Sequence, residues 1–505
     1  MHNSIFIKTY GCPNNQAESE IMSGLLSKNG YDIITESLDN KSKSDSARNR
    51  MTNCKSAIAK VDIIIINTCV VKSQTENKII DEIISIVKEY PGKKLIIAGC
   101  MPEIRKKIIK KKKKKASMIS THHIDKIVDV VNKITKSSSG DLARVKITDL
   151  RNKSAIGKTI ERVVLTGKAS NCKLLHPRIR TNDIVHITPI SSGCSSACAY
   201  CATKLAKGEL QSYNPEVIVN EIKNGLKQGC KEFWLTAQDC GCYGMDIMTK
   251  SSSRDLAIGK ITDLRNKSAI DINTNLPTLI NRIASLEGTF FLRIGMMNPM
   301  HLRKFYPELI KAYSNDKVFK FLHLPVQSGS DKLLQSMNRG YTNSEFIEII
   351  NAFKKAYPMI HIWTDVIAGL PGETEDDFQK TIGLLKKTAP EFTNVSRFTA
   401  RPGTAAAEME QIPNRIINER SSVLSELTRR ITIKKNKQWI GWSGKAIIEE
   451  HNQKKNSYLA RNYAYKPIVI TKPHKDLVNG KRLELGQIIN VKIIDTEKIL
   501  FGKIL

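Results

Sequence analysis

The stretch Ile184-Val-His-Ile-Thr-Pro-Ile190 leads into Cys194-Ser-Ser-Ala-Cys198-Ala-Tyr-Cys201, and the rest of the chain is organised around this pair. Thiolates are soft ligands that select iron–sulfur clusters, zinc or copper. A closed zinc site wants four ligands, usually in two well-separated pairs. Three cysteines within eight residues instead suit one face of a cubane cluster, with one iron left open for a substrate. We therefore predict an open iron–sulfur site, with three idle, buried cysteines as the alternative.

Downstream of this loop, apolar strands alternate with helical patterns, which predicts parallel strands. We expect the strands at 184–190, 232–237, 290–295, 321–326, 361–368 and 394–399, and the helices at 215–228, 276–286, 301–314, 343–356 and 376–387. Six such units predict a partial barrel, whose functional residues would lie at the strand C-termini. The sequence has there Gln238, Asp239, Gln327, Ser328, Asp365 and Gly369. Each polar residue could instead serve as a turn or cap, and Gly369 would let a cofactor approach the backbone closely.

The first 135 residues show the same alternation, with helices expected at 15–28 and 73–88. Near-continuous apolar strands indicate an open parallel sheet that is covered on both faces. Three of these strands end in a cysteine, namely Cys12, Cys69 and Cys100. Ligands of open parallel sheets bind outside the carboxyl ends of the strands, so we predict a second three-thiolate site. The alternative is that these are ordinary core cysteines.

Residues 437–505 contain short strands, expected at 445–450, 467–471, 487–494 and 500–505, which suggest a small antiparallel barrel. Charged and aromatic residues interleave there, a combination suited to RNA: Lys454, Lys455, Tyr458, Arg461, Tyr463 and Tyr465. An ordinary wet barrel surface is the alternative. The predicted class is thus α/β, with an open parallel sheet, a partial barrel over residues 181–436 and a small β-barrel.

The composition supports a polyanionic partner. The 505 residues include 80 Lys and Arg against 49 Asp and Glu, a net charge of +31, which favours nucleic acid over a membrane. The basic run Lys110–Lys115 could be a solvated face or an RNA contact. We expect no membrane span, because no apolar window of 18 residues occurs. The N-terminus does not resemble a signal peptide, and eleven cysteines without one favour cytoplasmic cluster ligation over disulfides.

A twenty-residue segment occurs twice, at 137–156 and 251–270, with 17 of 20 positions identical. A looser copy runs from 44 to 58. The spacing is irregular, so we interpret the copies as insertions in surface loops, where added length is tolerated; a repeated RNA-binding arm is the alternative. Residues 136–180 would then be an inserted repeat with a linker, 250–270 an insertion in the barrel, and Cys54 no ligand.

Motifs along the chain resemble those of the radical S-adenosylmethionine methylthiotransferases. They are Thr9-Tyr-Gly-Cys12, Asn67-Thr-Cys69, Ala98-Gly-Cys-Met-Pro102, the Cys194 loop, Phe321–Ser330, Asp365–Thr374 and Arg397–Thr404. Trp234–Asp239 and Gly295–Pro299 resemble the archaeal and eukaryotic branch, which acts on N6-threonylcarbamoyladenosine at position 37 of tRNA. The family layout implies a cluster domain, a radical barrel and a C-terminal TRAM domain. Cys240 and Cys242 depart from the family pattern, as a local feature or as a reactive thiol near the site.

The resemblance implies two [4Fe–4S] clusters. Cys194, Cys198 and Cys201 would hold the one that binds S-adenosylmethionine and generates a 5′-deoxyadenosyl radical, and Cys12, Cys69 and Cys100 would hold the one that carries sulfur. The residues expected around the cofactor are Tyr200, Gln238, Gln327, Ser328, Asp365 and Gly369. The expected partners are a tRNA anticodon loop, a reductant and a sulfur donor. Alternatives are a methylthiotransferase for isopentenyl-type adenosine or a ribosomal protein, and a non-catalytic iron–sulfur protein that binds RNA.

Overall fold

The computed structural model describes residues 4–35, 56–71, 73–106, 109, 116–136, 162–169, 172–247, 274–471, 477–478 and 481–505. The chain forms two compact units, one of Met1–Thr181 with Leu205–Lys207 and one of Asn182–Lys204 with Gly208–Leu505. The predicted boundaries after residues 135, 180 and 436 stay predictions. The repeats at 137–156 and 251–270, most of the copy at 44–58, Cys54 and the run Lys110–Lys115 lie outside the described residues.

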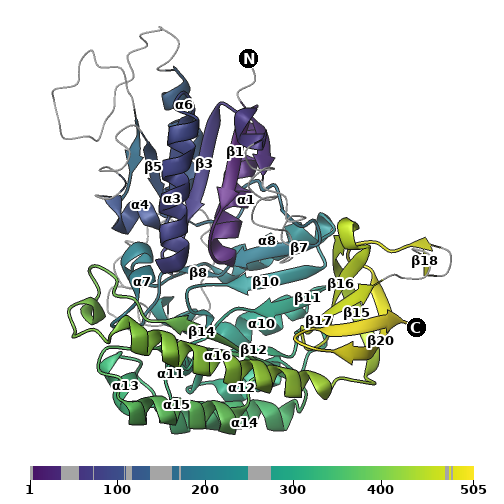
Figure 1. Cartoon of the computed structure of the whole chain (residues 1–505). Helices are drawn as coiled ribbons and strands as arrows, with labels where there is room; N and C mark the ends of the chain where they lie inside the picture. Colours follow the sequence, from purple (N-terminus) through teal and green to yellow (C-terminus); the bar gives the residue numbers. More distant parts are fainter. Residues whose placement is uncertain are drawn as a thin grey trace, which may run out of the picture. The chain divides into compact units, whose positions relative to one another are not determined.

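The first unit contains the predicted open parallel sheet, which confirms that part of the fold (Figure 1). The strand order is β2-β1-β3-β4-β5-β6, and each neighbouring pair runs in parallel. The strands are β1 (Ser4–Thr9), β2 (Asp32–Thr35), β3 (Ile63–Thr68), β4 (Lys94–Gly99), β5 (Ser117–Ser120) and β6 (Val164–Leu165). All of β3 is buried, as a central strand covered on both faces requires.

Helices connect these strands: α1 (Pro13–Lys28), α3 (Ser73–Glu89), α4 (Met101–Ile104) and α6 (Ile127–Lys136). Apolar residues of α1 and α6 pack against one set of alternating strand residues, for example Ile21 and Val130 against Ile63 and Ile65. The alternation of side chains along a strand puts such residues on one face. The helices α1 and α6 therefore cover one face of the sheet, and the cysteines lie at the carboxyl ends of its strands.

The second unit contains the six predicted parallel strands, in two hydrogen-bonded sets, β11-β10-β7 and β12-β13-β14. They are β7 (Val185–Pro189), β10 (Glu232–Thr236), β11 (Phe291–Ile294), β12 (Phe321–His323), β13 (His361–Ala368) and β14 (Phe392–Arg397), with the helices α8 (Pro215–Lys227), α10 (Leu276–Ala284), α14 (Asn343–Ala356) and α15 (Glu375–Thr388) (Figure 1). β12 is shorter than predicted because Pro325 follows, and proline has no N–H for a sheet. The helix predicted at 301–314 is in fact two, α11 (Pro299–Leu302) and α12 (Tyr306–Ala312). Pro307 lies in the first turn of α12, where proline is tolerated, whereas it would break a helix interior.

The C-terminal residues form a closed five-stranded barrel in the order β15-β16-β17-β21-β20. Its strands are β15 (Ser443–Asn452), β16 (Ser457–Asn462), β17 (Pro467–Thr471), β20 (Ile488–Thr496) and β21 (Leu500–Ile504). The prediction of an antiparallel barrel was wrong for one pair, because β17 and β21 run in parallel, which closes the barrel. The strand β16 was not predicted at all.

The location of β16 also corrects the predicted RNA-binding surface. Tyr458 is buried in the barrel core, at 2% exposure, whereas Tyr465, at 3% exposure, packs against aromatic side chains of β10 and β12. Arg461 pairs with Glu449, at 2.7 Å between Nε and Oε2, so these three side chains are engaged within the protein. Tyr463 is 40% exposed. The exposed Lys454 and Lys455 keep the prediction of an RNA contact open.

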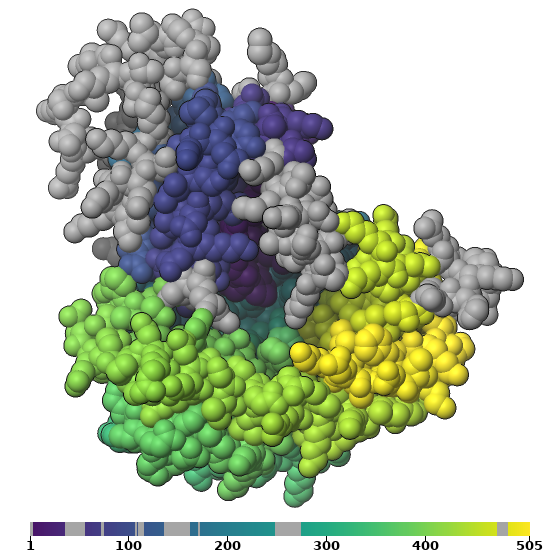
Figure 2. Space-filling model, in the orientation of Figure 1, coloured from purple at the N-terminus to yellow at the C-terminus, as the bar shows by residue number. Residues whose placement is uncertain are grey.

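A long helix, α16 (Asn414–Lys437), precedes the barrel, and Figure 2 shows its exposed face in yellow-green. Its buried residues include Ile417 and Arg420, which face β13, β14 and α15. In the part of the chain that the structure describes, no helix is both long and apolar enough to cross a bilayer.

Candidate active site

The first group of three cysteines lies at the carboxyl ends of adjacent strands. Cys69 and Cys100 directly follow β3 and β4, and Cys12 caps the N-terminus of α1 after β1. The segment before Cys12 lies close to Cys69, since a Cβ added to Gly11 would be 2.7 Å from the Cβ of Cys69. The structure therefore places the three residues at the same edge of the sheet, and their role as cluster ligands stays a prediction.

The thiols of this group influence one another electrostatically. Burial, and then the charge of Cys12, raise the pKa of Cys69 to about 11. Burial likewise raises the pKa of Cys100 to about 12, with Lys207 opposing the effect and the charges of Glu18, Cys69 and Cys12 adding to it. These thiols would hold their protons at neutral pH unless a cation displaced them, as metal ligation does. Three such thiols fit an iron–sulfur cluster.

A buried cluster of charges beside these cysteines was not found from the sequence. Lys173 and Lys207 share one carboxylate, Glu18, with 2.6 Å between Lys207 Nζ and Glu18 Oε1. Thr121 Oγ1 donates to the same oxygen and accepts from Lys173 Nζ at 2.8 Å. Two cations for one carboxylate leave a surplus positive charge, and Lys207 lowers the pKa of both Cys69 and Cys100. Such a charge would stabilise an anionic cluster on the three thiolates.

The pKa values in this cluster reflect burial and the sharing of one carboxylate by two lysines. Burial raises the pKa of Glu18, but Lys173 and Lys207 lower it to about 2 in total. Burial and the repulsion from Lys207 outweigh Glu18 and lower the pKa of Lys173 to about 8. The pKa of Lys207 is raised by Glu18 and the nearby cysteines, despite its burial. Among 80 Lys and Arg residues, no local pattern singles these two out.

The second group, Cys194, Cys198 and Cys201, occupies the loop between β8 (Ser191–Ser192) and α7 (Ala202–Lys207). Backbone amides point at its sulfurs, since Ser196 N donates to Cys194 Sγ and Lys204 N to Cys201 Sγ, both at 3.4 Å. Burial raises the pKa of Cys201, and the charges of Cys198 and Cys194 raise it further. The three cysteines thus lie in one loop, and their joint role as cluster ligands stays a prediction.

Arg339 lies against this second group and was also not found from the sequence. Its Nη1 is 3.3 Å from Cys198 Sγ and 3.4 Å from Tyr200 Oη, and its Nη2 donates to Pro325 O at 3.1 Å. The side chain is buried, so its charge acts on the sulfur with little screening by water. Tyr200, a predicted cofactor contact, is held by this arginine.

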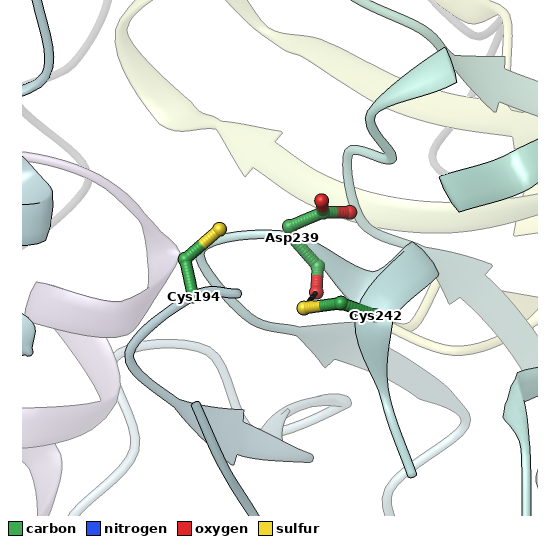
Figure 3. A group of neighbouring side chains, drawn as sticks. All are labelled: Cys194, Asp239 and Cys242. Atoms are coloured by element: carbon green, nitrogen blue, oxygen red, sulfur yellow. Dashed lines mark hydrogen bonds between the residues drawn. The ribbon is translucent and has the colours of Figure 1, made fainter. Parts of the chain in front are cut away.

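A third side-chain cluster joins Cys194 to the segment after β10. The Sγ atoms of Cys194 and Cys242 and a carboxylate oxygen of Asp239 lie within 4.8 Å of one another (Figure 3). The interaction of the two thiols lowers the pKa of Cys194 to about 7 and raises that of Cys242. Cys240 and Cys242 are both buried, in the short 3-10 helix η3 (Cys240–Cys242).

Of the predicted cofactor contacts, Gln238 shows the clearest sign of a missing partner. Its Oε1 is buried and has no hydrogen-bond partner among the described residues. Gln327 has a left-handed backbone, with φ at 72°, and is pinned between Asp365 O and Ile367 N. Ser328 is fully buried and accepts from Ser330 N at 3.2 Å. The roles of these three residues as cofactor contacts stay predictions.

Asp365 and Gly369 lie at the end of β13. The carboxylate of Asp365 is 2.7 Å from His323 Nε2 and accepts from Asn394 Nδ2 at 2.6 Å, so neighbouring strands hold it in place. Gly369 has φ at 79°, but the space that a Cβ would fill is taken by Ile417 of α16, at 2.4 Å. A side chain of this chain thus lies close to the Gly369 backbone, and the role of Gly369 as a cofactor contact stays a prediction.

Comparison with known proteins decides the family. A protein of Pyrococcus horikoshii named "Probable threonylcarbamoyladenosine tRNA methylthiotransferase" is 35% identical over 492 residues, which cover 96% of this chain and 99% of that protein. The "Threonylcarbamoyladenosine tRNA methylthiotransferase" of Homo sapiens is 31% identical over 483 residues, 95% of this chain and 71% of that protein. The chain belongs to this methylthiotransferase family.

Family models and a solved structure agree with this membership. The Radical SAM superfamily model matches residues 188–385 and the model of Uncharacterized protein family UPF0004 matches residues 37–121. The structure of the radical S-adenosylmethionine methyltransferase TsrM from Kitasatospora setae has a TM-score of 0.51 at 11% identity, over 81% of this chain and 77% of that one. That likeness concerns the fold alone. As a member of the family, the chain is an enzyme with radical S-adenosylmethionine chemistry, which depends on an iron–sulfur cluster.

Proposed function

We propose that this methylthiotransferase converts N6-threonylcarbamoyladenosine at position 37 of tRNA to its 2-methylthio derivative. The observation that carries the proposal is the pair of three-cysteine groups, one on the radical SAM barrel and one at the edge of the N-terminal sheet. One such group would serve to cleave S-adenosylmethionine, and the second would supply the sulfur. The relatives named for this substrate match over nearly the whole chain, which supports the choice of nucleoside.

The residues of both sites fit iron–sulfur clusters. Cys194, Cys198 and Cys201 would hold one [4Fe–4S] cluster, and Cys12, Cys69 and Cys100 a second, each with one iron not ligated by a cysteine. When bound, the clusters and S-adenosylmethionine supply a carbon radical for adenine C2 and the methylthio group placed there.

The protein's own side chains would orient these groups and balance their charge. Arg339 and Lys207 each provide a buried positive charge beside one set of thiolates. Gln238 Oε1, buried without a partner in the described part of the chain, is available to accept a hydrogen bond from S-adenosylmethionine. Asp365, held by His323 and Asn394, would present a fixed carboxylate at the same strand ends.

The tRNA would be held chiefly by charge. The net charge of +31 favours a polyanion, and Lys454, Lys455 and Tyr463 expose two cations and a stacking ring on the barrel. Unstacked bases of a single-stranded anticodon loop suit this kind of binding, and adenosine 37 would have to leave its stack to reach the barrel mouth. A reductant and a sulfur donor complete the reaction.

Mass spectrometry of tRNA nucleosides from cells with and without the gene tests this proposal. We expect the methylthio-threonylcarbamoyl nucleoside to disappear without the gene, and its unmodified precursor to accumulate. If this nucleoside is unchanged and a methylthio-isopentenyl nucleoside or a ribosomal protein loses its modification, the substrate is wrong. If anaerobically reconstituted protein forms no 5′-deoxyadenosine from S-adenosylmethionine under reductant, the protein only binds RNA.

A further inference from the structure

A fourth thiol lies beside the cysteine loop of the second unit. Cys242 Sγ, Cys194 Sγ and a carboxylate oxygen of Asp239 are all within 4.8 Å of one another, and Figure 3 shows the three side chains as neighbours. Cys242 is completely buried, whereas Cys194 is partly exposed. The proposed reaction uses Cys194 as a cluster ligand but gives Cys242 no task.

The backbone around Asp239 holds Cys242 in this place. Asp239 Oδ1 caps η3 by accepting from Gly241 N at 2.9 Å, and the Cys242 thiol donates to Asp239 O at 3.1 Å. Because the thiol, the carboxylate and the short helix are linked within four residues, Cys242 has little freedom to turn away from Cys194.

The cysteine loop is also linked to Asp239 by hydrogen bonds. His301 Nδ1 is 2.7 Å from Asp239 Oδ2, and its Nε2 is 3.1 Å from Ser195 Oγ, the side chain next to Cys194. Asn298 N donates to Asp239 Oδ1 at 3.0 Å, while Asn298 Nδ2 donates to Ser196 Oγ at 3.1 Å. Two links, through His301 and Asn298, thus join the loop to Asp239 at the start of η3.

The same hydrogen bonds argue against a metal site on these three residues. Both oxygens of Asp239 are occupied, by Gly241 N and Asn298 N on one side and by His301 on the other. A metal would have to compete with this network for the carboxylate. Two adjacent thiols without a third available ligand do not make a closed metal site.

We propose that Cys194 and Cys242 form a dithiol pair that hydrogen peroxide converts to a disulfide whenever the cysteine loop carries no cluster. In the first step the Cys194 thiol gives sulfenic acid, and one peroxide oxygen is transferred while water leaves. In the second step the Cys242 thiol attacks the sulfenic sulfur, the S–S bond forms, and a second water leaves. Peroxide is reduced to two waters, and the two thiols lose two electrons and two protons in total.

The pair would protect the cluster-free enzyme. Sulfenic acid that is not captured is oxidised further to sulfinic acid, which cellular thiols do not reverse, and a Cys194 in that form could no longer bind iron. A disulfide, in contrast, returns to two thiols on reduction. Cys194 suits the first step because it is partly exposed, and Cys242 suits the second because burial shields it from peroxide.

Peptide mass spectrometry of cluster-free, full-length protein tests the proposal without any dependence on tRNA activity. After treatment with hydrogen peroxide and alkylation, we expect a cross-linked peptide pair that joins Cys194 to Cys242. In a Cys242→Ala variant we expect sulfinic acid at Cys194 instead, at the same peroxide dose. Cys240→Ala is the matched control, because Cys240 is also buried in η3 but donates to Leu235 O, at 3.6 Å, and should leave the cross-link intact.

A second measurement separates protection from mere proximity. After the same peroxide treatment and then dithiothreitol, the wild-type protein and Cys240→Ala should regain their iron on reconstitution, and Cys242→Ala should regain markedly less. The proposal is overturned if Cys194 is cross-linked to Cys198 or Cys201 in place of Cys242, or if Cys242→Ala reloads iron as well as the wild type. Failure of the tRNA assay would overturn only the proposed function, since no step of this test uses tRNA.

Discussion

The substitution Glu18→Gln gives the most direct test of the buried charge cluster beside the first three cysteines. Glutamine keeps the size of the side chain and an oxygen that can accept hydrogen bonds, but it removes the charge shared by Lys173 and Lys207. Removal of one partner from a buried ion pair typically costs about 3–5 kcal/mol, because it leaves the other charge uncompensated.

For Glu18→Gln, the structure supports a loss of stability at the lower end of this range of about 3–5 kcal/mol. The pKa of Glu18 falls from its usual 4.5 to about 2, and each pKa unit corresponds to about 1.36 kcal/mol, which gives about 3 kcal/mol. Lys173 limits the loss, because its pKa is already only about 8 with Glu18 present. Without Glu18, the pKa of Lys173 should fall further, and the lysine would escape the penalty by losing its proton.

Hydrogen exchange followed by mass spectrometry measures this loss locally, which suits a chain of two units better than one global transition. We expect the core amides of α1 and β5 to exchange roughly two orders of magnitude faster at pH 7 in the variant, since about 1.4 kcal/mol is a factor of ten. Peptides from the C-terminal barrel strand β15 serve as the internal reference and should not change.

Glu20→Gln is the matched control on the same helix. Glu20 is also buried, but burial raises its pKa despite Arg178 and Thr181, so loss of its charge should not destabilise the unit. Because the folded-state pKa of Glu18 is depressed, its contribution is complete above pH 4.5 and is lost as the pH falls toward 2. The difference in exchange rate between the wild type and Glu18→Gln should therefore be smaller at pH 3 than at pH 7. Equal acceleration by both variants, or none by Glu18→Gln, would refute the reasoning.

Three further predictions concern the clusters and the pH dependence. Cys100→Ala should lower the iron content of reconstituted protein from about eight to about four per chain, while 5′-deoxyadenosine formation persists; unchanged iron would speak against a second cluster. Arg339→Met removes a charge 3.3 Å from Cys198 Sγ. In an electron paramagnetic resonance titration it should lower the ratio of reduced to oxidised cluster about tenfold at a fixed potential, which corresponds to about 59 mV, whereas Arg339→Lys should change the ratio less. Burial and then the charge of Glu449 raise the pKa of Glu232 to about 8, so its contribution to stability is complete below pH 4.5 and lost as the pH rises through 8. Glu232→Gln should make the midpoint of thermal unfolding less sensitive to a change from pH 5 to pH 9, and an unchanged sensitivity would contradict this assignment.

Local patterns in the sequence were sufficient for most of the secondary structure and for the position of Cys12, Cys69 and Cys100 after strands. The run Ile63–Ile66 is apolar at every position, which only a strand buried on both faces tolerates, and Cys69 follows it directly. Cys194, Cys198 and Cys201 are close in sequence, so they necessarily share one loop. The errors arose where the context was not local, as at β16, whose Tyr458 was assigned to the surface and is in the core.

The residues that surround the cysteines could not be found this way. Lys207 meets Glu18 across 189 positions, and Arg339 meets Cys198 across 141. A buried charge needs a carboxylate or sulfur beside it, and this partner is distant in the sequence. No short-range pattern therefore predicts which residue the partner is. The pairing of Cys242 with Cys194 is of the same kind, although Cys242 is visible in the sequence as a departure from the family pattern.

By itself, the sequence determined the parallel strands, the cysteine positions at their ends and the family, because hydrophobic period and ligand spacing are properties of neighbouring residues. Only the tertiary structure decided which charges and thiols face those cysteines. Burial of a charge is unfavourable unless an opposite charge lies beside it. Glu18 provides that charge for Lys173 and Lys207, and only the folded chain brings these three residues together.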